Sequence, residues 1–220
     1  MEDDTPARPP LAGMRSDYLR AQLRRGGLRD DPAAQFEAWL GDALAANLIE
    51  PNAMNLATVS ADGRPLSRTV LLKAFDTRGF VFFTNLESRK ARHIAENPHV
   101  CLLFPWLALE RQVIITGTAE KISVAESLQY FLTRPRDSQL AAWASKQSSK
   151  ISSRKVLEME WEHIKAKFSA GKVPLPSFWG GFRVKPETIE FWQGGPSRLH
   201  DRFQYTRQPD DSWTIERLAP

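Results

Sequence analysis

The spacing of apolar residues predicts helices near the start of the chain and in its second half. Between Pro32 and Leu48, apolar positions recur at the three- and four-residue spacing of an amphipathic helix. The basic segment Met14–Leu28 is predicted to form a short helix that ends at Gly26-Gly27. Further helices are predicted at 89–96, 123–134, 137–144 and 153–169.

Runs rich in β-branched and aromatic residues predict strands between these helices. Two of them flank the turn Ala61-Asp62-Gly63, which favours a hairpin. The predicted strands are 55–60, 67–73, 79–84, 100–104, 111–119, 182–192 and about 212–217. Closely spaced strands with helices outside them predict an α+β, mostly antiparallel barrel. We expect a disordered tail at 1–13 and a single domain at 14–220 that begins with the helical segment.

Composition and charge limit the classes of protein and ligand that fit this sequence. The 220 residues are 42% hydrophobic and 25% charged, with a net charge of +4, which suits an anionic small molecule as well as a nucleic acid. The single cysteine, Cys101, and the absence of an H-x-x-x-H pair argue against a metal site. The start M-E-D-D-T-P does not resemble a signal peptide, and no apolar run is long enough to span a membrane. We therefore expect a cytoplasmic protein with no metal.

The segment 191–203, F-W-Q-G-G-P-S-R-L-H-D-R-F, carries a dense set of candidate residues. If 198–203 is extended, the two-residue period of a strand places Arg198, His200 and Arg202 on one face. Such a face would suit an anionic or electron-rich ligand, with Trp192 as an aromatic wall and the following Gly194-Gly195 allowing close approach. The alternative is a solvated strand edge with scattered charge.

Two clusters at helix ends could bind phosphate. Ser88 is a candidate N-cap for a helix whose first turn carries Arg89 and Lys90, cations that oppose the helix dipole unless an anion binds there. Tyr130 and Arg134 share a helix face, and Ser138 lies in the first turn of the next helix. The alternatives are solvated surface cations and an ordinary helix break.

Other features are open to more than one interpretation. Arg68 and Lys73, five residues apart, would point to opposite faces of a strand and serve two anions, or one of them is only an edge charge. The loop 145–150, S-K-Q-S-S-K, is either a linker or a further phosphate site. Because the dinucleotide, P-loop and nucleophile-elbow motifs are all missing, any redox chemistry requires a cofactor bound outside a Rossmann fold.

A series of longer motifs runs in one order from about Arg15 to the C-terminal R-L-A-P. They are R-T-V-L-L-K (68–73), S-R-K-A (88–91), L-E-R-Q-V (109–113), Y-F-L-T-R-P-R-D-S-Q (130–139), S-K-Q-S-S (145–149), P-L-P-S-F-W-G-G-F-R-V (174–184), I-E-F-W-Q-G-G (189–195) and R-L-H-D-R-F (198–203). In this order they resemble the pyridoxine/pyridoxamine 5′-phosphate oxidase family. The resemblance implies an FMN-binding split β-barrel that works as a homodimer with active sites shared between subunits. It also implies oxidation of pyridoxine 5′-phosphate and pyridoxamine 5′-phosphate to pyridoxal 5′-phosphate, with O2 reduced to H2O2.

The resemblance also implies roles for individual residues. The FMN phosphate and ribityl chain would be held by Arg68, Arg89, Lys90, Gln147 and Ser148. Contacts near the flavin ring would come from Thr69, Val70, Leu71, Leu72, Lys73, Phe83, Thr84, Gln112, Trp192 and Arg202. The substrate phosphate would be bound by Lys73, Tyr130, Arg134 and Ser138. The catalytic residues Arg198 and His200 would cover the substrate ring, with Arg15 and Tyr18 closing the site.

The chain departs from the family pattern in two places. Phe83 stands where a Tyr is common, and Ser16-Asp17 interrupts a more basic N-terminal pattern. Two other hypotheses also fit the sequence. One is a different split-barrel flavoprotein, which would not need the cup of Tyr130, Arg134 and Ser138. The other is a basic barrel that binds nucleic acid on aromatic platforms. We expect neither a nucleic-acid nor a membrane partner.

Overall fold

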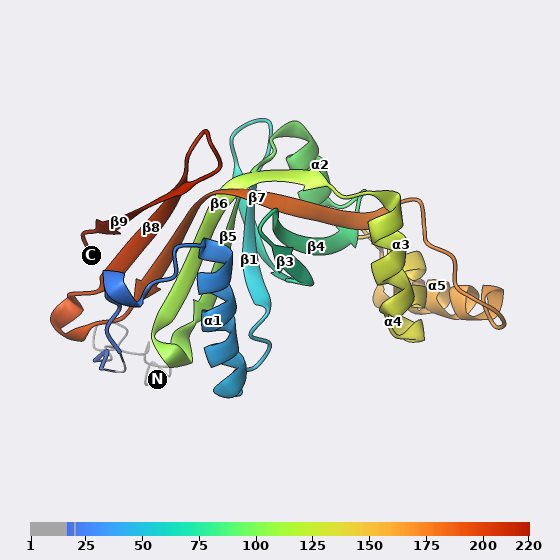
Figure 1. Ribbon diagram of the computed structural model, residues 1–220. Coiled ribbons are helices and arrows are strands. Elements are labelled where there is room, and N and C mark those ends of the chain that lie inside the picture. The colour runs from blue at the N-terminus through green and yellow to red at the C-terminus, as the bar shows by residue number, and fades with distance from the viewer. Residues whose placement is uncertain (1–16, 20) are drawn as a thin grey trace, which may run out of the picture.

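Within residues 17–19 and 21–220, which the computed structural model describes, nine strands form one antiparallel sheet (Figure 1). The order is β2-β1-β5-β6-β7-β4-β3, and β8 pairs with both β7 and β9. The strands are β1 (Ala53–Val59), β2 (Pro65–Leu71), β3 (Ala74–Asp76), β4 (Gly79–Asn85), β5 (His99–Trp106), β6 (Arg111–Lys121), β7 (Trp179–Gln193), β8 (Asp201–Arg207) and β9 (Trp213–Leu218). The predicted fold class is confirmed.

Five α-helices and three short 3₁₀ turns complete the described part of the chain. They are α1 (Pro32–Ala45), α2 (Arg89–Glu96), α3 (Val124–Thr133), α4 (Arg136–Ala144) and α5 (Arg154–Lys167), with η2 (Arg25–Gly27), η3 (Leu107–Leu109) and η4 (Pro196–Arg198). Local sequence explains several helix starts: Asp31 caps α1 ahead of Pro32, and Ser123 with Glu126 forms a capping box on α3.

The main core lies between α1 and the sheet. Phe36 of α1 is fully buried, and its ring lies about 5 Å from the rings of Phe75, Phe80 and Phe104, at 5.0, 5.0 and 4.9 Å between centroids. These edge-on contacts are the favoured geometry for aromatic pairs. A second apolar cluster, which includes Phe131 and Trp179, joins α3, α4 and α5 to the first residues of β7. It anchors the helices at one end of the sheet.

The longest strand, β7, connects two different regions of the molecule. Its first half pairs with β4 and its last half pairs with β8, while β6 runs along its other side. In Figure 1, α3–α5 lie beside the start of β7, and β8 and β9 lie beside its end. Residues near Trp179 and residues near Trp192 are therefore at opposite ends of the sheet.

The helix predicted for Met14–Leu28 is wrong where the structure describes it. Residues 17–19 and 21–24 are not helical, and only η2 forms a turn. The Leu23 amide donates to the Asp201 carboxylate at 2.9 Å, and Leu23 and Leu28 both enter the main core, so tertiary contacts override helix propensity. The predicted tail at 1–13 lies outside the described residues.

The remaining predicted helices and strands are confirmed, with ends that differ by a few residues. Two strands were not predicted. The first, β3, is only three residues long. The second, β8, does carry a signal, because Phe203 and Tyr205 alternate inward with polar neighbours. That alternation was available in the sequence.

Candidate active site

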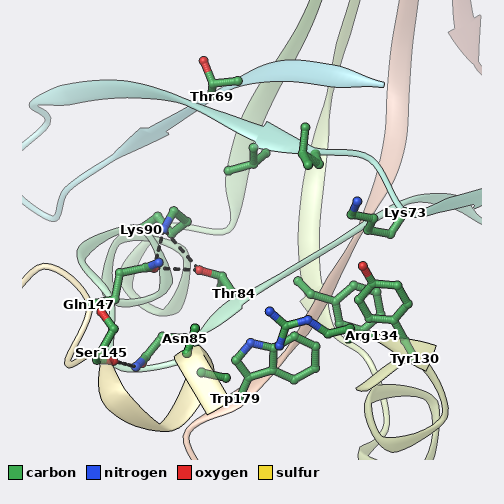
Figure 2. Close-up of a pocket in the computed structure, with 15 residues that line it drawn as sticks. Thr69, Lys73, Thr84, Asn85, Lys90, Tyr130, Arg134, Ser145, Gln147 and Trp179 are labelled. Atoms are coloured by element: carbon green, nitrogen blue, oxygen red, sulfur yellow. Dashed lines mark hydrogen bonds between the residues drawn. The ribbon is translucent and has the colours of Figure 1, made fainter. Parts of the chain in front are cut away.

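A cavity of about 400 Å³ opens between β2, β4, the start of α2 and the helices beside β7 (Figure 2). Its lining residues are Thr69, Val70, Leu71, Lys73, Phe83, Thr84, Asn85, Lys90, Tyr130, Arg134, Ala141, Ala142, Ser145, Gln147 and Trp179. We call it the phosphate cavity. Lysine and arginine side chains line it, but none of these described lining residues is an Asp or a Glu. The cavity therefore favours an anion.

Arg68, next to this cavity, is anchored through one nitrogen only. Its Nη1 donates to the Leu56 carbonyl and to the Thr58 hydroxyl, both at 2.8 Å. Its Nη2 is buried and has no hydrogen-bond partner among the described residues. Burial, and then the charge of Arg89, lowers the pKa of Arg68. A buried guanidinium nitrogen without an acceptor is costly, so this edge is suited to a bound anion.

Lys90 lies on the wall of the cavity, in the first turn of α2. Ser88 caps this helix, as predicted, by accepting from the Ala91 amide. The Lys90 ammonium donates to the Gln147 side-chain oxygen at 2.7 Å and to the Thr84 hydroxyl at 3.1 Å (Figure 2). Burial, and then the charge of Arg68, lowers the pKa of Lys90 to about 8. Neutral oxygens leave its charge available to an anionic ligand.

The loop 145–150 is held against the start of α2. The Arg89 amide donates to the Ser148 hydroxyl at 3.3 Å, and Asn85 donates to the Ser145 carbonyl at 3.4 Å. Ser148 has a φ of 70°, a conformation that costs energy for a residue with a Cβ. The Arg89 side chain itself is exposed. The structure thus brings the predicted residues Arg89, Lys90, Gln147 and Ser148 together.

On the other side of the cavity, Arg134 lies over aromatic rings (Figure 2). Phe83, Tyr130 and Trp179 are nearly parallel, with the Phe83 ring 4.0 Å from Tyr130 and 5.3 Å from Trp179. The Arg134 guanidinium carbon lies 4.8 Å from the Trp179 ring centroid. Its Nη1 is buried without a hydrogen-bond partner among the described residues, and burial lowers the pKa of Arg134.

Tyr130 and Lys73 complete this side. Burial raises the pKa of Tyr130 despite the nearby Arg134 charge, so the phenol remains a donor. The predicted alternation between Arg68 and Lys73 does not apply, because β2 ends at Leu71. Lys73 lines the cavity all the same. Ser138, although in the first turn of α4 as expected, is not among the lining residues.

A second group of predicted residues lies at the far end of β7. We call Tyr18, Trp192 and His200 the Trp192 cluster. The rings of Trp192 and His200 are 4.7 Å apart, and Tyr18 is edge-on to Trp192 at 5.8 Å and to His200 at 5.5 Å. His200 Nδ1 accepts a hydrogen bond from the Gly195 amide at 3.1 Å, which leaves Nε2 as the nitrogen that can carry the proton of the neutral ring.

The common face predicted for Arg198, His200 and Arg202 is wrong. Residues 196–198 form the turn η4, with φ of 53° at Ser197 and 63° at Arg198, and β8 begins only at Asp201. Arg202 is paired with Glu190 at 2.8 Å, whereas the Arg198 side chain is exposed. The alternation of side chains between the two faces of a strand cannot continue through a turn that contains left-handed residues.

The glycine pair before this turn does not leave room for a ligand. A Cβ at Gly194 would lie 2.7 Å from the Tyr18 ring, and one at Gly195 would lie 2.3 Å from the Leu199 carbonyl oxygen. The glycines instead allow the chain to pack against itself. This corrects the interpretation drawn from the sequence.

Two predicted groups are therefore separated within one chain. Trp179 borders the phosphate cavity and Trp192 belongs to the other group, and both lie on β7. A strand advances about 3.3 Å per residue, so roughly 40 Å of strand separates them. Gln112 pairs directly with Trp192, and Arg202 follows on the neighbouring strand. Arg15 lies outside the described residues.

Trp179 was missed as a site residue, although it lies within the motif F-W-G-G-F. The following Gly180-Gly181 pair is a signal for close packing. A Cβ at Gly181 would lie 3.0 Å from the Phe83 ring, so this glycine lets Phe83 lie against the strand. Thr58 was also missed, because its contact with Arg68 depends on the pairing of β1 with β2.

Comparison with known proteins identifies the family. Residues 40–168 match the family model described as pyridoxamine 5′-phosphate oxidase. The chain belongs to this family. Residues 179–220 match the pyridoxine 5′-phosphate oxidase C-terminal dimerisation region, which contains most of the Trp192 cluster.

Full-length relatives support the assignment to the pyridoxamine 5′-phosphate oxidase family. Proteins named pyridoxine/pyridoxamine 5′-phosphate oxidase from Crocosphaera subtropica and Shewanella amazonensis are 63% and 59% identical. Each alignment covers 96% of this chain and 99% of the relative. The family resemblance stated from the motifs is confirmed.

Solved structures agree on the fold. The crystal structure of PhzG from Burkholderia lata, in complex with tetrahydrophenazine-1-carboxylic acid, is 30% identical, with a TM-score of 0.84 over 90% of this chain and 98% of PhzG. A pyridoxamine 5′-phosphate oxidase-related, FMN-binding protein from Nostoc punctiforme is 19% identical, with a TM-score of 0.68 over 84% of this chain and 97% of that protein. The second likeness supports the split-barrel fold alone.

Two further observations concern the described residues only. None of their helices is both long and apolar enough to cross a membrane. No group of three or more His, Cys, Asp or Glu side chains among them is arranged to hold a metal ion.

Proposed function

We propose that the protein is an FMN-dependent oxidase that converts pyridoxine 5′-phosphate and pyridoxamine 5′-phosphate to pyridoxal 5′-phosphate, with O2 reduced to H2O2. The observation that carries the proposal is the pair of buried, unpartnered guanidinium nitrogens, on Arg68 and Arg134, at two sides of a site without carboxylates. Two such donors suit two phosphates, one on the cofactor and one on the substrate.

The Arg68 side of the cavity fits the FMN phosphate. Arg68 and Lys90 offer charged donors beside the start of α2, and Arg89, Gln147 and Ser148 surround them. Residues 69–73, with Phe83 and Thr84, would lie along the flavin ring. When bound, FMN supplies the redox chemistry by taking two electrons from C4′ of the substrate and passing them to O2.

The Arg134 side fits the substrate phosphate. Arg134 presents a buried Nη1 that has no hydrogen-bond acceptor among the described residues, Lys73 adds a second cation, and Tyr130 adds a phenol donor. Ser138 would join them through a small shift at the start of α4. Anchoring the phosphate here would orient the pyridine ring, so that C4′ is held in one position for the reaction.

Arg198 and His200 would complete the site from the partner subunit of a homodimer. A single chain keeps them roughly 40 Å of strand away from the phosphate cavity, too far for any side chain to reach. The match of 179–220 to a dimerisation region supports a partner that supplies this end of β7. Trp192, Gln112 and Arg202 would contact the flavin from the same direction, and Tyr18 with Arg15 would cover the substrate.

The roles of Arg198 and His200 follow from their surroundings. Arg198 is exposed on a turn, so its guanidinium is free to contact the polar edge of the substrate ring. His200 is oriented by the Gly195 amide and by Trp192, which leaves its protonated Nε2 to donate a hydrogen bond to the substrate group at C4′. We propose both as the catalytic pair.

An anaerobic spectral titration tests the proposal. The purified protein should be yellow, and adding pyridoxamine 5′-phosphate or pyridoxine 5′-phosphate without oxygen should bleach the flavin absorbance. Admitting air should restore the colour and yield one H2O2 per pyridoxal 5′-phosphate. A colourless protein that does not bind added FMN would contradict the cofactor assignment. A yellow protein that neither substrate bleaches would favour a different split-barrel flavoprotein.

A further inference from the structure

Thr58, described above only as a contact of Arg68, and His93, which has no role so far, form a chain of contacts with the Arg68 guanidinium. Thr58 lies on β1 and is fully buried, and His93 lies on α2, which packs on β1. The Thr58 hydroxyl oxygen lies 2.8 Å from Arg68 Nη1 and 3.2 Å from His93 Nδ1. It therefore connects the guanidinium to the imidazole.

The direction of these hydrogen bonds follows from the groups involved. A guanidinium can only donate, so the Thr58 oxygen must accept from Arg68. The Thr58 hydroxyl hydrogen is then free to donate, and its nearer acceptor is His93 Nδ1 at 3.2 Å rather than the Leu66 carbonyl at 3.5 Å. In this arrangement Nδ1 accepts, and the proton of the neutral imidazole is on Nε2.

Resting on the proposed FMN site, we infer that Thr58 and His93 are positioning residues that orient Arg68 for the FMN phosphate. Both hydrogens of Arg68 Nη1 are used, one by the Leu56 carbonyl and one by Thr58. This double anchor fixes the plane of the guanidinium, and its Nη2 stays buried without a hydrogen-bond partner among the described residues. His93 in turn fixes the Thr58 hydroxyl as an acceptor toward Arg68.

Removing the Thr58 hydroxyl should weaken phosphate binding specifically. Thr58→Val should lower the affinity for FMN by roughly tenfold, the scale of a lost hydrogen bond to a charged group. It should leave the affinity for riboflavin, which lacks the phosphate, unchanged. Thr58→Ser keeps the hydroxyl and should bind FMN as the wild type does. Thr116→Val removes a hydroxyl paired with Thr188 elsewhere in the sheet and is the matched control.

Variants of His93 test the hydrogen bond between the Thr58 hydroxyl and His93 Nδ1. Asn places an amide oxygen near the position of Nδ1, so His93→Asn should retain FMN affinity, whereas His93→Leu should lower it severalfold. Nitrogen-15 NMR of histidine-labelled wild type at pH 8, assigned by comparison with His93→Asn, should show the proton of His93 on Nε2.

Several results would overturn the inference. These are a Thr58→Val protein that binds FMN like the wild type, equal losses for FMN and riboflavin, or a His93 with its proton on Nδ1. If Thr58→Val does not fold, the NMR measurement on the wild type still decides. A wild type that does not bind FMN, or an Arg68→Ala variant that binds it normally, would instead overturn the proposed function.

Discussion

The guanidinium of Arg134 lies over the indole ring of Trp179, 4.8 Å from its centroid, and no described residue accepts a hydrogen bond from its buried Nη1. The aromatic face therefore positions this cation without neutralising it. A carboxylate partner would have occupied the same donors that a phosphate needs. The contact leaves Arg134 both oriented and available.

Replacing Trp179 should change the preference for phosphorylated substrate. A cation–π contact of about 0.5–2 kcal/mol corresponds to a roughly three- to thirtyfold change in the affinity for the phosphate. We expect Trp179→Leu to raise the KM for pyridoxamine 5′-phosphate by this factor, with little change for unphosphorylated pyridoxamine. Trp179→Phe should keep most of the preference. Steady-state kinetics on both amines measures it.

The control for this prediction is Trp143→Leu, which alters an aromatic residue of the same helical region. Trp143 packs on Phe168 and Phe178, and its indole N–H donates to the Pro174 carbonyl at 2.8 Å. Equal losses for the two amines in Trp179→Leu would mean that Trp179 acts only through general packing.

FMN affinity should depend on pH through Lys90. The pKa of Lys90 is about 8 in the protein without ligand, because burial and then Arg68 disfavour its charge. The phosphate, a dianion above pH 7, favours the ammonium and raises that pKa in the complex. The complex thus holds a proton that the free protein loses above pH 8, and affinity should fall as the pH rises from 8 to 9.5.

Fluorescence titration of FMN across this pH range measures the effect. Lys90→Gln should bind FMN more weakly at pH 7 and show a much flatter pH profile. Lys155→Gln, which changes an exposed lysine on α5, should retain the wild-type profile. An unchanged slope in Lys90→Gln would assign the linkage to another group.

The separation of the two groups along β7 predicts complementation between variants. Arg134→Ala alters the phosphate cavity and Arg198→Leu alters the other end, so each homodimer should have low activity. A mixed dimer keeps one of its two sites intact, so the purified mixed dimer should have about half of the wild-type activity, and random pairing in an equal mixture should restore about a quarter. Co-expression with two different affinity tags and an activity assay on the doubly tagged dimer tests this.

The negative control combines two changes in the same group. Arg134→Ala with Lys73→Ala should give no recovery, because every site in the mixed dimer then carries one of them. A site shared between subunits would be contradicted if activity recovered in the Arg134→Ala and Lys73→Ala mixture. It would also be contradicted if no activity recovered in the Arg134→Ala and Arg198→Leu mixture.

Arg198 and His200 should affect turnover and spare flavin binding. We expect Arg198→Leu to lower kcat/KM at least ~10-fold, which corresponds to about 1.4 kcal/mol of transition-state stabilisation. His200→Asn should have a milder effect, because its amide can retain the contact with the Gly195 amide. Both proteins should remain yellow. Loss of flavin with unchanged turnover per bound FMN would place these residues at the cofactor instead.

Local patterns predicted much of the fold. The β1–β2 hairpin depends on a turn and two adjacent strands, and the start of α2 depends on the Ser88 cap, so neighbouring residues determine both. The helix predicted for 14–28 failed because contacts with Asp201 and the core, far away in the sequence, decide that segment. The extended conformation considered for 198–203 was wrong at its start, because Ser197 and Arg198 adopt left-handed φ values. Such values at non-glycine residues have no simple sequence signal.

The sequence predicted which residue types form the candidate site better than it predicted where those residues lie in space. The motifs indicated phosphate donors, and the family resemblance supplied roles for them. Neither could show that Arg68 and Lys90 lie at the opposite end of β7 from His200, since that separation depends on strand register. The anchoring contacts of Arg134 on Trp179 also required the packing of α3 against β7.

The length of β7 has a consequence for how this chain can change. In the proposed dimer the length of this one strand sets how far each chain reaches into the site that it shares. Deleting two residues within β7 would preserve which side chains face the core but shorten the reach by about 7 Å. Both sites would then be misaligned at once. Surface loops can vary in length without this penalty, whereas the length of this strand is constrained by the partner.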